Sequence, residues 1–307
     1  MGIKKKANNL KAFIKEGVWD IDLDELSKAR ARFVKYLKVL LITIRTFSAE
    51  KIGFQAVALS FFCTMSAVPF IAIAFAVTGG LGLAEKLKEL LYTYFSNSQE
   101  TIDIILTFAD NIIATSQSGT MGLISFLLFV WVVIWMMFSV ERVFNNVWKV
   151  RKQRALYKRV PVYLAMLFIA PMTVLVFFFG SSVFDSLLEY IGLNVTSFST
   201  FKTILTWLVS WVVTMLTFSA MYKFIPNAKV QYSNALRAAL LSGTAFTVVQ
   251  YLYTETQFFV TRLNTVYGMF ATVPLFMVWL NVGWFIILFG AEVSYAFQHV
   301  DNYNISD

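Results

Sequence analysis

The sequence predicts an all-α membrane protein with six transmembrane helices. Of its 307 residues, 58% are hydrophobic and only 14% are charged, whereas soluble domains have about 45–50% and about 25%. Several uncharged runs also approach the roughly 20 residues that a helix needs to cross a hydrocarbon core. The alternative is a soluble protein with a large buried core, and the number of these long runs argues against it.

Six apolar runs supply the predicted spans of a transmembrane domain at 54–297. The first and third runs contain Pro69 and Pro171, and an interior proline kinks a helix because it removes one backbone hydrogen bond. The third run begins at Pro161, in a first turn where proline is well tolerated. The predicted spans are about 54–80, 121–140, 161–184, 203–224, 235–259 and 271–297.

The distribution of lysine and arginine predicts how these spans are oriented. With six spans, 22 of the 26 cations fall in segment 1–53 and in the loops on the same side, and four fall on the other side. Loops on the cytoplasmic side carry an excess of lysine and arginine. We therefore predict that segment 1–53 and the tail at 298–307 are both cytoplasmic.

Amphipathic helices are predicted on both sides of the membrane. Apolar residues of segment 26–44 recur at helical spacing with lysines and arginines between them. This pattern is typical of a helix lying on the cytoplasmic membrane surface, and a surface helix of a small cytosolic subdomain is the alternative. In the first external loop we predict two further amphipathic helices, at about 84–95 and 99–115. They pack on the outer mouth of the bundle or dip into the membrane.

Several polar residues lie within the predicted spans or at their inner ends. A charge inside a membrane costs about 2.5–3.5 kcal/mol at the centre and less near an interface, so each should have a partner. Glu141 and Arg142 end the second span, and Glu292 lies at a similar depth in the sixth. We predict that Arg142 pairs with Glu292, or that both carboxylates share its guanidinium. Gln250 and Asn281 lie deeper. These residues line a cavity open to the inner leaflet, or they only fix helix packing.

A basic loop follows the second span. Residues 142–159 contain seven cations and no acid. Cations near a membrane surface attract anionic headgroups by about 1 kcal/mol each. The predicted headgroup contacts are Lys149, Arg151, Lys152 and Arg154.

Residue patterns for catalysis are weak or missing. The chain has one histidine, His299, and one cysteine, Cys63, so a His/Cys zinc site is excluded. It lacks the GxxxxGK[ST] phosphate loop. Its acids are scattered, whereas a two-metal nuclease needs clustered carboxylates. We expect no catalytic residues, no metal, no cofactor and no nucleic-acid partner.

The pattern Glu141-Arg142-x-x-Asn145-x-x-Trp148-x-Val150-x-x-x-Arg154 resembles the signature after the second span of the YihY/BrkB family of bacterial inner-membrane proteins. The resemblance covers about residues 35–297 and adds Asn145 to the candidate polar residues. Where many relatives have a tyrosine in the first span, this chain has Phe61 and Phe62. Three further stretches fit the same pattern: Ala58 to Phe62 with Pro69; Tyr222 to Asn227; and Tyr267-Gly268 through Pro274, Trp279 and Trp284 to Gly290-Ala-Glu292.

The resemblance implies an inner-membrane location and a family without a settled biochemical activity. Some members were once labelled ribonuclease BN, an assignment now considered mistaken, and members have been connected with envelope integrity, serum resistance and export of lipid A precursors. We therefore expect a non-enzymatic protein that binds and translocates a lipid or other anionic amphiphile. The alternatives are a scaffold that recruits a partner or anionic lipid through its basic inner face and, third, a membrane nuclease.

The predicted topology is tested by cysteines introduced as Glu100→Cys and Gln153→Cys. Because position 100 is expected outside and position 153 inside, a membrane-impermeant thiol reagent added to intact cells should label only position 100. Labelling of position 153 from outside, or protection of position 100, would contradict the orientation.

Overall fold

The computed structural model describes residues 26–80, 120–150, 199–262 and 268–303, with a few further positions within 18–21, 88–111 and 152–163. Every regular element in this described part is helical, which confirms the all-α class there. The elements are α2 (Lys28–Ala49), α3 (Ile52–Gly80), α6 (Thr120–Val147), α8 (Ser199–Phe224), α9 (Tyr232–Arg262), α10 (Gly268–His299) and the short 3₁₀ helix η4 (Val300–Asn302).

Helices cover five of the six ranges that the sequence predicts as spans. α3, α6, α8, α9 and α10 each enclose the corresponding range and extend a few residues beyond it. The remaining range, 161–184 with Pro171, lies outside the described residues except at positions 161 and 163. Within the described part, the segments Tyr232–Thr256 and Pro274–Asn302 are long and apolar enough to cross a membrane.

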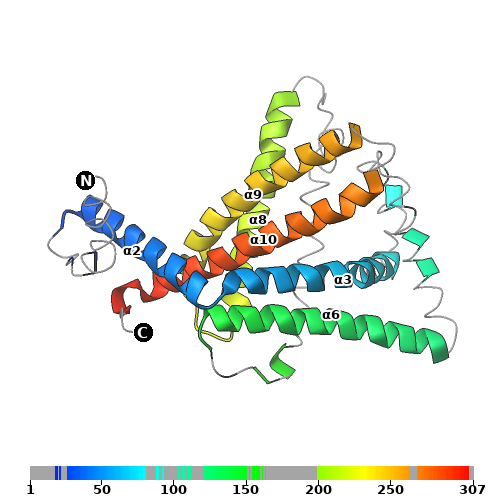
Figure 1. The fold of residues 1–307 in the computed structure, drawn as a ribbon, viewed down its shortest axis with the longest axis horizontal. Coiled ribbons are helices and arrows are strands. Elements are labelled where there is room, and N and C mark those ends of the chain that lie inside the picture. The colour runs from blue at the N-terminus through cyan, green and yellow to red at the C-terminus, as the bar shows by residue number, and fades with distance from the viewer. Residues whose placement is uncertain are drawn as a thin grey trace, which may run out of the picture.

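α10 lies at the centre of a row of helices (Figure 1). α9 packs between α10 and α8 on one side, and α3 packs between α10 and α6 on the other, while α2 packs against α10 and α3. The five long helices converge where α2, η4 and the C-terminus lie, and they separate toward the opposite end (Figure 1). We refer to the described residues within 39–52, 141–163, 218–238 and 288–303 together as the converging end.

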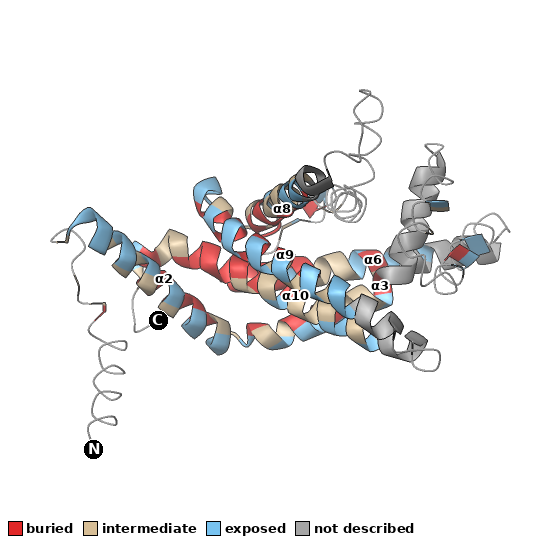
Figure 2. Ribbon diagram, turned by 90° about the horizontal axis from the view of Figure 1, so that it is seen from above, coloured by how far each residue is buried: buried red, intermediate tan, exposed pale blue. Residues whose placement is uncertain are grey.

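Burial is concentrated at the converging end. Residues 290–296 of α10 are all buried, so this part of the helix is surrounded on every side. Figure 2 shows the buried positions gathered on α10 near its contact with α2. Large apolar side chains are instead exposed on the outward faces of the long helices, among them Phe54, Met65, Trp131, Leu208, Leu252 and Val278.

α10 approaches α8 and α9 very closely at Gly290. The Tyr222 hydroxyl of α8 and the Ser242 hydroxyl of α9 form a 2.7 Å hydrogen bond directly against this glycine. A Cβ atom at position 290 would overlap the Tyr222 hydroxyl and would lie 2.7 Å from Ser242 Cβ. The absence of a side chain at position 290 therefore allows three helices to meet at one level.

We predict that Gly290→Ala destabilises the protein by about 1–3 kcal/mol, the usual cost of overpacking a well-packed interior. Gly53→Ala is the matched control, because a Cβ there would lie 3.8 Å from its nearest neighbours. Alanine should therefore be neutral at position 53, or stabilise α3 by up to about 1 kcal/mol through its higher helix propensity. Thermal unfolding in detergent compares the two variants, and equal stability would contradict the close packing at Gly290.

Candidate functional site

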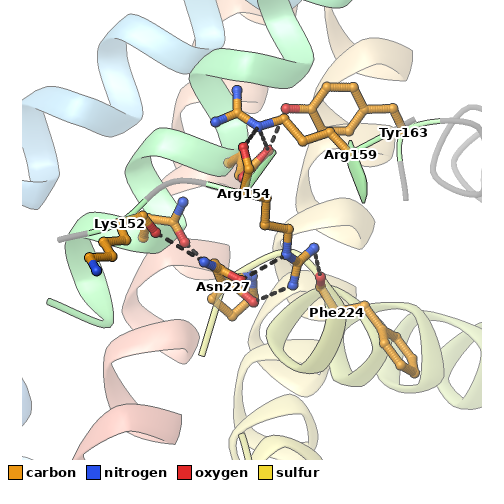
Figure 3. A network of polar contacts seen from close by, with 9 residues as sticks. Lys152, Arg154, Arg159, Tyr163, Phe224 and Asn227 are labelled. Carbon is orange, nitrogen blue, oxygen red and sulfur yellow. Dashed lines mark hydrogen bonds and ion pairs between the residues drawn. The ribbon is translucent and has the colours of Figure 1, made fainter. Parts of the chain in front are cut away.

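The loop after α6 is joined to the turn between α8 and α9 by the side chain of Arg154 (Figure 3). Its guanidinium donates to the backbone oxygens of Phe224 at 2.9 Å and Pro226 at 2.7 Å. Its Nε atom donates to Asn227 Oδ1 at 3.2 Å. Arginine suits this position because its planar group carries five donors in a fixed geometry.

Asn227 extends this contact to α6. Its backbone N–H donates to Asn145 Oδ1 at 2.7 Å, and its Nδ2 donates to the backbone oxygen of Lys152 at 3.0 Å. α8 ends at Phe224 because Pro226 has no N–H and disfavours a helical conformation in the residue before it. The turn therefore leaves backbone carbonyls open, and Arg154 satisfies two of them.

Glu141 is buried and interacts with Arg159 and Tyr163. Arg159 Nε lies 3.5 Å from Glu141 Oε2, and the Tyr163 hydroxyl donates a hydrogen bond to the same oxygen. Arg159 Nε also donates to the backbone oxygen of Arg154 at 3.0 Å. A buried carboxylate needs both charge and hydrogen-bond partners. The basic loop and the segment that follows it supply them to Oε2, while Oε1 has no hydrogen-bond partner among the described residues.

The predicted ion pair between Arg142 and Glu292 is wrong. Arg142 is exposed on α6, whereas Glu292 is fully buried on α10 and forms a 2.8 Å hydrogen bond with Thr46 of α2. The physical reason is helix geometry: neighbouring residues point about 100° apart around the axis, so Glu141 faces inward while Arg142 faces outward.

The six candidate polar residues are not assembled into one site. Glu141 and Asn145 lie at the loop contacts, while Glu292 lies against α2. Asn281 is half-buried on α10 about 16 Å along the helix from Glu292. Gln250 is buried on α9, and its Oε1 atom has no hydrogen-bond partner among the residues that the structure describes.

The predicted headgroup contacts also separate into different environments. Lys149 and Lys152 are exposed at the converging end, and Arg151 lies outside the described residues. Arg154 is occupied by its three contacts with the α8–α9 turn, so we assign it to holding the loops together.

Four partner residues at these contacts were not identified as site residues from the sequence: Thr46, Arg159, Tyr163 and Asn227. Arg159 was visible as a cation of the basic loop, and Asn227 belongs to the stretch from Tyr222 to Asn227. Neither feature of the sequence indicates which residue Arg159 or Asn227 contacts. Thr46 is one threonine in an apolar helix and carries no signal of its own. In the described part, no group of three histidine, cysteine or acidic side chains is placed to hold a metal ion.

The all-helical fold, its apolar helices and their exposed apolar faces define a helical membrane protein. Residues 43–307 match the family described as Virulence factor BrkB. The chain belongs to this family, as the sequence resemblance predicted.

Several relatives are named as UPF0761 membrane proteins. The chain is 26% identical over 266 residues to one from Acinetobacter baylyi, covering 85% of this chain and 62% of the relative. For a Janthinobacterium relative the identity is 27% over 261 residues, covering 82% and 58%. For a Legionella pneumophila relative it is 25% over 285 residues, covering 88% and 64%. The chain thus spans about three fifths of the length of these relatives. No solved structure matches it.

A pair of double-mutant cycles tests these assignments. Because Glu141 and Arg159 are in direct contact, Glu141→Gln and Arg159→Gln should be coupled by about 0.5–3 kcal/mol in the free energy of unfolding. Arg142→Gln and Glu292→Gln form the control cycle and should add to within about 0.5 kcal/mol. Reversible detergent denaturation measures both cycles. Equal coupling in the two pairs would show that the contacts are assigned wrongly.

Proposed function

We propose that this protein is a six-span protein of the bacterial inner membrane, with both termini cytoplasmic, that binds and translocates a lipid or other anionic amphiphile of the cell envelope. The observation that carries the proposal is how exposed apolar and cationic side chains are distributed over the structure. Apolar side chains are exposed along the long helices, and exposed cations gather where these helices converge.

The exposed apolar side chains occur on each of the long helices. A contiguous apolar patch on the surface of a protein marks a region that contacts a membrane or another protein. α6 exposes Trp131 and Trp135, and α9 exposes Val248, Tyr251 and Leu252. These faces are suited to contact acyl chains, both those of the surrounding bilayer and those of a bound amphiphile.

The exposed cations at and beside the converging end are suited to bind the charged part of the same molecule. Anionic headgroups are attracted by lysine and arginine near the membrane surface. The exposed cations come from α2 and the residue after its C-cap, from the end of α6 and the loop that follows it, and from the region around the α8–α9 turn: Lys28, Arg30, Arg32, Arg45, Lys51, Arg142, Lys149, Lys152, Lys158, Lys229 and Arg237.

α2 adds an apolar stripe beside these cations. Phe33, Tyr36, Leu40 and Ile44 follow one another at helical spacing and are all exposed. The buried face of α2 contains Val39, Ile42 and Thr46. A helix with an exposed apolar stripe and basic flanks is typical of the membrane interface. This supports a headgroup layer at the level of α2.

Translocation, rather than binding alone, is supported by the asymmetry of the bundle. Arg154, Asn227 and Glu141 tie loops and helices together by polar contacts at the converging end. The same long helices separate toward the other end (Figure 1). A scaffold that recruits a partner through its basic face requires the exposed cations but not this difference between the two ends.

Anionic lipid that copurifies with the protein, quantified by native mass spectrometry, tests binding. Lys149→Gln combined with Lys152→Gln should weaken retention by about 2 kcal/mol, or about 30-fold, if each cation contributes about 1 kcal/mol. Lys86→Gln combined with Lys202→Gln removes two cations on the predicted outer side and should retain lipid normally. Equal retention by both double variants would contradict headgroup binding at the converging end.

Proteoliposomes with a fluorescent anionic phospholipid in one leaflet test translocation. The protein should move the probe to the other leaflet faster than protein-free vesicles do, and the Lys149/Lys152 double variant should be slower than the control pair. Binding without any movement of the probe would reject translocation and leave the scaffold.

A further inference from the structure

Glu292 lies buried where α10 meets α2. Its side chain is fully buried, and its Oε2 atom lies 2.8 Å from Thr46 Oγ1. Its Oε1 atom has no hydrogen-bond partner among the described residues. A buried carboxylate is costly unless it is paired and fully hydrogen-bonded.

Thr46 Oγ1 lies among several acceptors. It is 2.8 Å from Glu292 Oε2, 2.8 Å from the backbone oxygen of Ile42 and 3.3 Å from that of Thr43. The threonine hydroxyl has one proton to share among them, and a backbone carbonyl has none to donate. A proton on Glu292 would let its carboxyl group donate to Thr46 Oγ1 and would leave the threonine proton for the backbone oxygens.

We propose that Glu292 is a proton-binding site, and that the bound proton holds the C-terminal half of α2 against α10. In the protonated state, the Glu292 carboxyl donates to Thr46 Oγ1 and Thr46 donates to the Ile42 carbonyl. When Glu292 ionises, its proton passes to solvent. The charge is then buried between α10 and α2 with no ion-pair partner among the described residues. Such a charge is costly unless water reaches it, so this part of α2 separates from α10.

Two charged groups act on Glu292 from the elements around it: Lys149, just after α6, and Glu50, just after α2. The side chain of Lys149 is exposed, so solvent screens its charge. The local factors that decide whether Glu292 is protonated are then its hydrogen bond with Thr46 and the burial of its carboxyl group.

The N-terminal half of α2 is held by different contacts. Lys35 Nζ lies 2.8 Å from Asp301 Oδ2, and the Tyr36 and Phe297 rings meet edge to face with centroids 5.7 Å apart. Neither contact involves Glu292. Loss of the proton should therefore loosen residues around 42–50 and leave those around 28–36 unchanged. The contact is strongest at low pH and weakens as pH rises through the titration of Glu292.

Hydrogen exchange of the full chain in lipid nanodiscs, followed by mass spectrometry over a pH series and corrected for intrinsic exchange rates, tests this proposal. Protection of 42–50 should fall about tenfold across the titration, the effect of leaving one buried group without a hydrogen bond. Peptides covering 28–36 provide the internal reference. Uniform protection of 42–50 at every pH would overturn the proposal.

Three variants identify the group that titrates. Glu292→Gln keeps a donor toward Thr46 but cannot ionise, so 42–50 should stay protected at every pH. Thr46→Val removes the acceptor, so this segment should exchange faster even at low pH. Thr43→Val is the matched control, because Thr43 is equally buried on α2 but donates to the Val39 carbonyl and should keep the pH dependence of the parent chain. A pH dependence that persists in Glu292→Gln would overturn the assignment.

Infrared difference spectroscopy of the parent chain gives a second measurement that does not depend on folding of the glutamine variant. A protonated-carboxyl stretching band should disappear as pH rises and should shift in Thr46→Val, which removes its hydrogen bond. Absence of the band, or no shift in Thr46→Val, would reject Glu292 as the proton site. None of these measurements involves lipid movement, so the proton site and the proposed translocation can fail separately.

Discussion

The hydrogen bonds of Arg154 are the contacts on which the arrangement of the converging end depends. Within a membrane, helices gain little from apolar association, because lipid chains are as apolar as the side chains they would replace. Polar contacts and close packing must then hold the bundle together. Arg154 bonds the α8–α9 turn at three points, and Asn227 carries the connection on to α6 through Asn145. These contacts join α6 to α8, the two described helices at the ends of the row.

Close packing of the helices also stabilises the converging end. Gly290 lets α10 lie against the hydrogen-bonded Tyr222 and Ser242, so the centre of the row meets α8 and α9 at one level. Glu292, two residues further along α10, lies against α2. One short segment of α10 therefore contacts three other helices. A change in the protonation of Glu292 would act two residues from the close contact at Gly290.

The signature that first suggested the family has a structural explanation in this chain. Glu141 and Asn145 lie on the interior face of α6, while Arg154 lies in the loop that folds back onto the α8–α9 turn. Their spacing places the first two about one helical turn apart, and so on one face. The described contacts of these residues hold elements together. Lipid contact is therefore better sought among the exposed lysines and arginines around them.

The all-α class and the positions of five apolar helices followed from the sequence, because long uncharged runs and helical periodicity are local properties that composition reveals. The orientation follows from the lysine and arginine distribution and stays a prediction. The partners of the charged residues could not be predicted: Glu141 contacts Arg159 and Glu292 contacts Thr46, whereas depth alone had suggested Arg142. Depth along a helix is fixed by residue number, but the direction in which a side chain points depends on how each helix is rotated against its neighbours. That rotation was decided by packing between distant segments, and only the tertiary structure contains it.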